Sequence, residues 1–271
     1  MTLCRRLVWV ICGVLGISEL GFAQEMRIYT TIRDRSLSSA AKQADQRSLM
    51  LFHAGKVFDY IEPAQEVTVF EPAHRRFTVL NLRRQLRSEL TQDEIRQFLG
   101  LAEDEARRRL TIADEDAPSA TRKSLDFLRF QLQPEFTTSF DSAKSRLSLA
   151  SPQFQYTVEG FAPPSQDIVD KYLHVADWMA QFNSVLHPQS LLPSPRMKLN
   201  QELRQRGLIP KSVDLLATSD AAIHLQAQHE WTWNLQKTDR QMIDDWEKQL
   251  QNPKLRSLPF RQFQQEMLNR Q

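Results

Sequence analysis

Cysteine and glycine are the two residue types whose scarcity says most about this sequence. The 271 residues include two cysteines, Cys4 and Cys12, and seven glycines. Because both cysteines precede residue 24, the rest of the chain can form neither a disulfide framework nor a cysteine-based zinc site. A domain stabilised by its hydrophobic core is what this composition favours.

The few glycines also limit the chemistry of the chain. After residue 23 they stand far apart, at Gly55, Gly100, Gly160 and Gly207. Phosphate-binding loops and dinucleotide turns need clustered glycines, so we expect no nucleotide cofactor. The sequence contains no His-x-x-x-His, His-Glu-x-x-His or Gly-x-Ser-x-Gly motif. We therefore assign no metal, no cofactor and no catalytic residue, and a hydrolase is the least favoured function.

The first 23 residues resemble a secretory signal peptide. Arg5 and Arg6 precede an apolar run over residues 7–17, and Gly-Phe-Ala at 21–23 supplies the small residues of a cleavage site. The run is shorter than the roughly 20 apolar residues of a membrane anchor. We expect an exported protein, periplasmic or secreted, that has no stable membrane anchor once residues 1–23 are cleaved.

The charges of the remaining chain are balanced. Residues 24–271 hold 33 Lys and Arg against 32 Asp and Glu. Such a balance gives no electrostatic basis for binding nucleic acid or a strongly anionic membrane. We expect no nucleic-acid partner.

Alternation of apolar and polar residues predicts a sheet. The longest alternating segment covers residues 223–235, and its length indicates a large curved sheet. Shorter segments predict further antiparallel strands, at 26–33, 57–61, 67–70, 76–80, 136–140, 147–149 and 154–158. Leu49-Met50-Leu51-Phe52 is apolar towards both sides, which predicts a strand covered on both faces.

Three segments have helical periodicity. Thr91 and Glu94 form a capping box before a helix that reaches residue 110, and further helices are expected over 166–186 and 239–250. Prolines at 188, 193 and 195 indicate a surface linker. The fold class is α+β: a large curved antiparallel sheet, which could be an incompletely closed barrel, with helices packed on one face. We expect one domain over 24–250 and a C-terminal tail over 251–271.

The candidate ligand-binding residues are the most apolar ones of two strands: Leu49, Leu51, Phe52, Trp231 and Trp233. Tryptophan gives a ligand a large surface with one polar edge. Packing in the core is the alternative interpretation, and it also applies to His229, which shares the apolar face of its strand. His224 should face the opposite side from His229, because their positions differ by an odd number.

Charged clusters have simple structural interpretations. The segment from Glu71 to Arg76 could bind an anion or could be a solvated turn between strands. Arg107-Arg108-Arg109 lies in the last turns of the first predicted helix, where cations complement the helix dipole.

The segments 48–60, 66–72 and 75–77 look like those of uncharacterised secreted bacterial proteins, and the order of elements resembles the periplasmic lipoprotein carriers of the LolA/LolB type. That resemblance implies a curved, incompletely closed sheet that holds acyl chains beneath helices. We therefore expect a non-enzymatic envelope or secreted protein that binds a lipid or another apolar ligand between sheet and helices. The alternative is a protein-interaction or scaffold module with a partner in the cell envelope.

Overall fold

The structure is a computed structural model that describes residues 25–36, 45–112, 119–187, 190–218 and 222–268. The predicted signal peptide, residues 1–23, lies outside the described residues.

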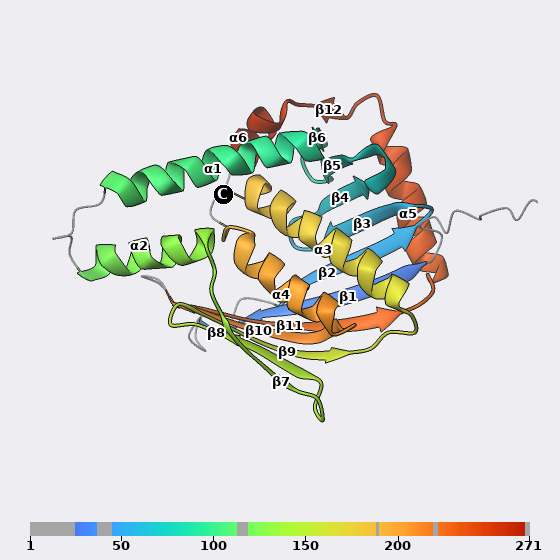
Figure 1. Cartoon of the computed structure of the whole chain (residues 1–271). Coiled ribbons are helices and arrows are strands. Elements are labelled where there is room, and N and C mark those ends of the chain that lie inside the picture. The colour runs from blue at the N-terminus through green and yellow to red at the C-terminus, as the bar shows by residue number, and fades with distance from the viewer. Residues whose placement is uncertain (1–24, 37–44, 113–118, 188–189, 219–221, 269–271) are drawn as a thin grey trace, which may run out of the picture.

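Within the described chain, twelve strands form one open sheet (Figure 1). The strands are β1 (Met26–Asp34), β2 (Gln46–His53), β3 (Lys56–Ile61), β4 (Glu66–Glu71), β5 (Arg76–Asn81), β6 (Leu86–Thr91), β7 (Thr137–Asp141), β8 (Arg146–Ala150), β9 (Phe154–Phe161), β10 (Ile209–Thr218), β11 (Ala222–Thr232) and β12 (Arg256–Ser257). Their order across the sheet is β12-β6-β5-β4-β3-β2-β1-β11-β10-β9-β8-β7, and only the β12–β6 pair is parallel. The predicted α+β class with a large curved antiparallel sheet is confirmed, and the sheet does not close into a barrel.

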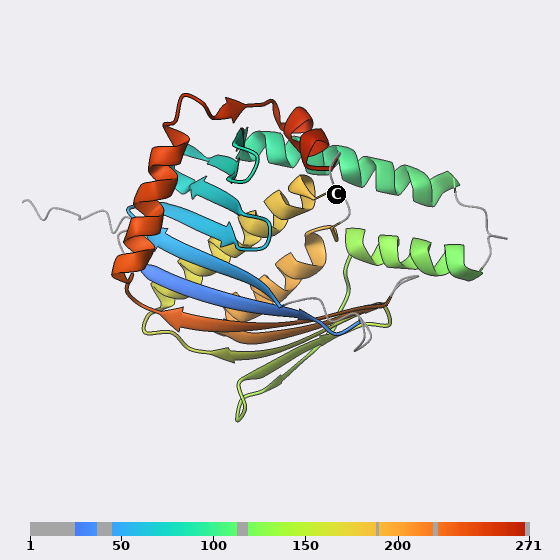
Figure 2. The same cartoon turned by 180° about the vertical axis from the view of Figure 1, so that it is seen from behind.

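The helices cover both faces of this sheet. They are α1 (Gln92–Ile112), α2 (Ser119–Leu132), α3 (Gln166–Leu186), α4 (Ser194–Gln205), α5 (Lys237–Leu250) and α6 (Phe260–Leu268). Helices α3 and α4 lie inside the curve of the sheet, on what we call the inner face, whereas α5 crosses the opposite, outer face (Figure 2). The position of α5 departs from the expectation of helices on one face only.

Strand β2 explains why the outer face needs a helix. Leu49 and Leu51 point outwards into the cluster that includes Trp246 of α5, whereas Phe52 belongs to the inner core. Side chains of a strand point alternately to the two faces of the sheet. A strand that is apolar throughout therefore needs cover on both faces to keep its side chains out of water. The prediction from Leu49-Met50-Leu51-Phe52 is confirmed.

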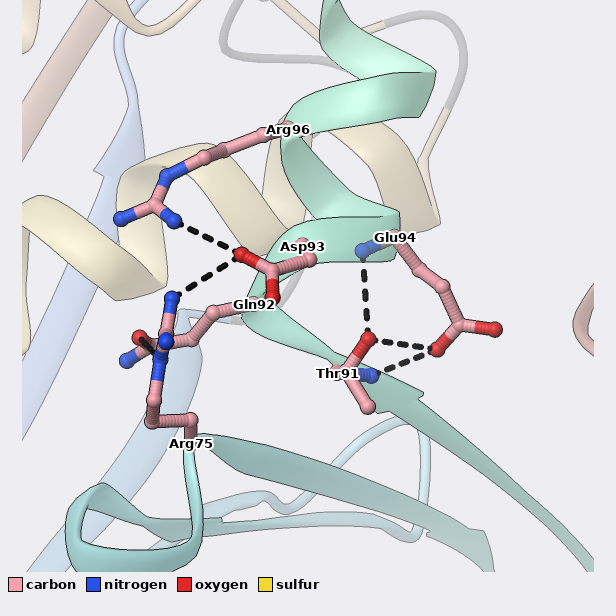
Figure 3. A network of polar contacts seen from close by, with 6 residues as sticks. All are labelled: Arg75, Thr91, Gln92, Asp93, Glu94 and Arg96. Carbon is pink, nitrogen blue, oxygen red and sulfur yellow. Dashed lines mark hydrogen bonds and ion pairs between the residues drawn. The ribbon is translucent and has the colours of Figure 1, made fainter.

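The predicted capping box begins α1 (Figure 3). The backbone N–H of Thr91 donates to Glu94 Oε2 over 2.7 Å, and the backbone N–H of Glu94 donates to Thr91 Oγ1 over 3.2 Å. These bonds satisfy N–H groups that have no partner inside the helix. Beside them, Arg75 and Arg96 each donate to Asp93 Oδ1 over 2.9 Å. The cap joins the end of the β1–β6 meander to the helix that follows it.

The other two predicted helices are also present. Helix α3 has the predicted bounds, and α5 begins two residues before the predicted start. Strand β11 ends three residues earlier than the prediction, since Leu235 has already reached the outer-face core, where it is buried. The backbone N–H of Gln236 then donates to Asp239 Oδ2 over 2.7 Å in the first turn of α5.

The expectation of a proline-marked linker is wrong at Pro195, which belongs to α4, and a strand, β10, follows that helix. Pro195 lies in the first turn of α4, where its missing N–H breaks no helical hydrogen bond. The helix is fixed by burial of Leu199 and Leu203, both 0% exposed. The prolines thus mark the start of a helix that packs on the sheet.

The last described segment also packs on the domain. Strand β12 pairs with β6, and Phe260 and Phe263 of α6 are buried in the inner-face core. Leu258, Phe260 and Phe263 of the expected tail therefore contribute side chains to the same core as the sheet.

Candidate ligand cavity

Helix α3 presents two different flanks to the inner face of the sheet. One flank carries large rings, and Phe182 stacks on Phe77 of β5 with ring centroids 4.7 Å apart. The other flank carries small side chains at helical spacing, namely Ala176, Ala180, Asn183 and Ser184. Where the small flank faces the sheet, the side chains leave space unfilled.

That space includes a cavity of about 490 Å³, which we call the apolar chamber. Its floor is formed by strands β1, β9, β10 and β11, and its wall by α3 and the segment before α4. Aliphatic side chains dominate the lining: Ile32, Leu191, Leu192, Val213, Leu215, Ile223, Leu225 and Ala227. Its volume falls in the range of about 300–1,000 Å³ that is typical of small-molecule sites.

A second cavity, of about 210 Å³, adjoins the first and is more polar; we call it the polar chamber. The two share a wall made of Thr30, Ala180, Asn183, Arg196 and His229. Beyond this wall the polar chamber reaches Ser48 of β2, Asp59 of β3 and Tyr172 of α3. The inner face thus offers an apolar space and a polar space side by side.

His229 lies at the boundary between the two chambers. Its Nδ1 is 2.9 Å from Thr30 Oγ1 in a hydrogen bond across the β1–β11 pair. Its Nε2 is shielded from solvent and has no hydrogen-bond partner in the described chain. Burial, and secondarily the charge of Arg196, lowers the pKa of His229 to about 4. The imidazole is therefore neutral near pH 7, and its Nε2 has no partner among the described residues.

Arg196 supplies the positive charge of this boundary. Its Nε donates to Asn200 Oδ1 over 3.0 Å, and Asn200 in turn donates to Asp177 Oδ1 over 2.8 Å. This chain of bonds orients the guanidinium without neutralising it, since no ion pair of Arg196 with a carboxylate occurs among the described residues. The lowered pKa of His229 is one effect of that charge.

A half-buried carboxyl group, Asp59, and a buried one, Glu66, lie on neighbouring strands of the inner face. Burial raises the pKa of Asp59 to about 7. Burial, and secondarily the charge of Asp59, raises the pKa of Glu66 to about 7. Glu66 is 2% exposed and its Oε1 accepts no hydrogen bond in the described chain, although His187 Nε2 lies 3.9 Å away. Both carboxyl groups change protonation near neutral pH.

The predicted ligand-binding residues lie outside both chambers. Leu49 and Leu51 face α5 on the outer side, and Phe52 is buried in the inner core. Trp231 packs against Tyr172 with centroids 4.8 Å apart and donates its Nε1–H to the Pro210 carbonyl over 2.9 Å.

Trp233 packs beside Trp231, with ring centroids 5.9 Å apart. The apolar face of residues 223–229 on the same strand does line the apolar chamber. The strand and its face were therefore predictable, whereas the position of the hollow along it was not.

The remaining charged motifs have local partners. His224 Nε2 lies 3.2 Å from Asp214 Oδ2, on the other side of β11 from His229, as the spacing predicts. In the turn between β4 and β5, Arg76 Nη2 pairs with Glu71 over 2.6 Å. Arg107, Arg108 and Arg109 pair with Glu103, Asp104 and Glu105 on their own helix.

Sequence comparison adds no relative from which a role could be transferred. No protein-family model matches this sequence, and no curated protein sequence matches it at a significant level. Within the described residues, no helix is both long and apolar enough to cross a membrane. Nor do any three His, Cys, Asp or Glu side chains of that part gather as the ligands of a metal ion would.

Proposed function

We propose that this protein is a non-enzymatic envelope or secreted protein that binds a lipid or another apolar ligand in the apolar chamber. The observation that carries the proposal is a cavity of about 490 Å³ with aliphatic walls between the sheet and α3. A cleft of this size with apolar walls is typical of small-molecule binding sites.

The hydrophobic effect would supply the affinity. Apolar surface removed from water stabilises a complex by about 25 cal/mol per Å². Most of the side chains that line the chamber lie on strands and on α3, and the connection before α4 contributes Leu191 and Leu192. Export of the protein is part of the proposal, on the basis of the signal-peptide pattern in residues 1–23. The proposed mode of binding is that of the carriers that the chain resembles.

A cavity-filling variant tests this function. Ala227 lies on β11 and lines the apolar chamber, so Ala227→Phe would occupy the space of the ligand. Ala222 is exposed on the same strand, and its side chain points to the other face, so Ala222→Phe is the matched control. The measurement is saturable uptake of a fluorescent fatty acid by the purified protein. We expect binding by the wild type and the control, and at least a tenfold loss with Ala227→Phe. Absence of saturable binding by the wild type would refute the proposal.

A protein-interaction module is the second candidate, and one observation favours it. Strand β7 forms one edge of the sheet, and all five of its residues are exposed. An extended peptide can add to such an edge through backbone hydrogen bonds. Ser139→Pro would remove one backbone donor of β7. A partner that cross-links to the wild type in envelope extract and is lost with Ser139→Pro would support this function.

A further inference from the structure

The boundary between the chambers holds two polar groups, Arg196 and His229, whose hydrogen-bonding capacity is only partly used within the described chain. The guanidinium of Arg196 has no carboxylate partner in the described chain, and Nε2 of His229 has no hydrogen-bond partner there. A buried polar atom without a partner costs free energy, which applies to Nε2 of His229, whereas Arg196 is half-buried and keeps donors available. Both groups line the polar chamber and the apolar chamber, so one ligand could contact them from either space.

We propose that the ligand is a single-chain amphiphile with a carboxylate head, such as a fatty acid, whose head enters the polar chamber and pairs with Arg196. The hydrocarbon chain occupies the apolar chamber. The inference rests on the proposed function, which it makes specific. Arginine is suited to this role because its planar guanidinium donates two parallel hydrogen bonds to a carboxylate.

The other groups of the polar chamber are compatible with an anionic head. Thr30, Ser48, Asn183 and Tyr172 contribute neutral hydrogen-bonding groups. His229 is neutral and can complete the set of partners through Nε2.

Asp59 is the remaining charged group that lines the polar chamber. When its carboxyl is protonated, Arg196 leaves the chamber with one net positive charge. When Asp59 ionises, the two charges cancel.

Because of these charges, the affinity for a carboxylate should depend on pH. The groups that face Asp59 are Ser48 on β2, Tyr172 on α3, Arg196 on α4 and His229 on β11, while Glu66 acts on it from β4. Of these, Glu66 also ionises near neutral pH, and its added negative charge acts in the same direction as that of Asp59. Affinity for a carboxylate should therefore be higher at about pH 6 than at about pH 8, because both side chains lose protons in between.

The test compares two ligands of equal chain length. The affinities of dodecanoate and of dodecanol are measured by displacement of a bound fluorescent probe at about pH 6, where a free carboxylic acid is already ionised. The protein is the purified wild type, Arg196→Gln, Arg196→Lys and the control Lys198→Gln, which removes an exposed charge from the same helix.

The wild type and the control should bind dodecanoate about tenfold more tightly than dodecanol. Arg196→Gln should abolish that preference by weakening the binding of dodecanoate more than that of dodecanol, and Arg196→Lys should restore part of it.

The possible results distinguish a failure of the proposed carboxylate specificity from a failure of the proposed apolar-ligand function. Equal affinity of the wild type for the two ligands would overturn the inference and leave the proposed function standing. Failure of both ligands to bind would refute the proposed function as well. If Arg196→Gln does not fold, the comparison of the two ligands on the wild type and on Arg196→Lys still decides the outcome.

Discussion

The two flanks of α3 lie on the same sheet and have opposite consequences for it. Over β4 and β5, Phe182, Phe77 and Phe70 stack in sequence, with centroids 4.7 and 4.2 Å apart, and all three rings are 0% exposed. Over β1 and β11, Ala180 and Asn183 leave the two chambers open. The difference indicates that the half of the inner face over β4 and β5 stabilises the fold. The half over β1 and β11 offers space for a ligand. Each half can be perturbed separately.

The largest expected effect is a loss of stability from the packed half. Leu90 of β6 is 2% exposed, and Leu90→Ala should lower the free energy of unfolding by about 3 kcal/mol through lost burial and the cavity it leaves. Leu225 lines the apolar chamber and is partly exposed to it, so Leu225→Ala should cost less than about 1 kcal/mol. Denaturant unfolding of both variants checks the difference. Equal losses would show that the chamber is filled by side chains in solution.

A second effect should come from the half-buried carboxyl group of the hollow half. The pKa of Asp59 rises from 3.8 to about 7 on folding, so the folded state binds the proton more tightly than the unfolded state. The domain should therefore lose stability as the pH rises from about 4 to about 7, because the unfolded state gives up this proton at a lower pH than the folded state.

Asp59→Asn should remove that loss, and it should stabilise the domain at about pH 8 while having little effect at about pH 4. Glu230→Gln, an exposed carboxylate on β11, is the control. Unfolding by urea at several pH values measures the effect, and a variant with the same pH profile as the wild type would contradict it.

The smallest effect should arise at the cap of α1, which contacts α3 beside the packed half. Thr91→Ala removes the hydroxyl that accepts the Glu94 N–H, and should cost about 1 kcal/mol. Thr91→Ser keeps the hydroxyl and should cost little. Neither variant should change affinity for the fatty-acid probe, since the cap is outside both chambers. A matching loss of affinity in Thr91→Ala would show that the two halves are coupled.

Local sequence patterns predicted those helices and strands whose own residues carry a clear pattern. The box Thr91/Glu94 predicted α1, and the alternation in 223–235 predicted β11 and its apolar face. Helix α4 was not predictable in the same way, because Pro193 and Pro195 indicate a turn equally well and the burial of Leu199 depends on tertiary contacts.

The candidate site was only partly predictable, because a cavity arises where segments distant in sequence fail to fill a space. Nothing in Ala180 or Asn183 alone indicates that they face Ala227. One residue in the sequence does indicate a site. Asp59 interrupts the apolar strand 57–61 and lies on the same face as Val57. A carboxylate on the apolar face of a strand is partly removed from water, and ionisable groups in such positions occur often at functional sites.

The central position of β1 has a consequence for how the chain folds. Strand β1 pairs with β2 on one side and with β11 on the other, in a register that places Ile28 opposite Trp231. The strands β1–β6 are consecutive in the sequence and can pair with one another early. The second edge of β1 stays without its partner until β11, which ends at residue 232, has been synthesised. Pairings of such long sequence separation form slowly and leave a strand edge exposed to other chains. The unpaired edge of β1 should therefore be the main site of aggregation during folding. Stabilising the β10–β11 pair should shorten the time for which that edge is exposed.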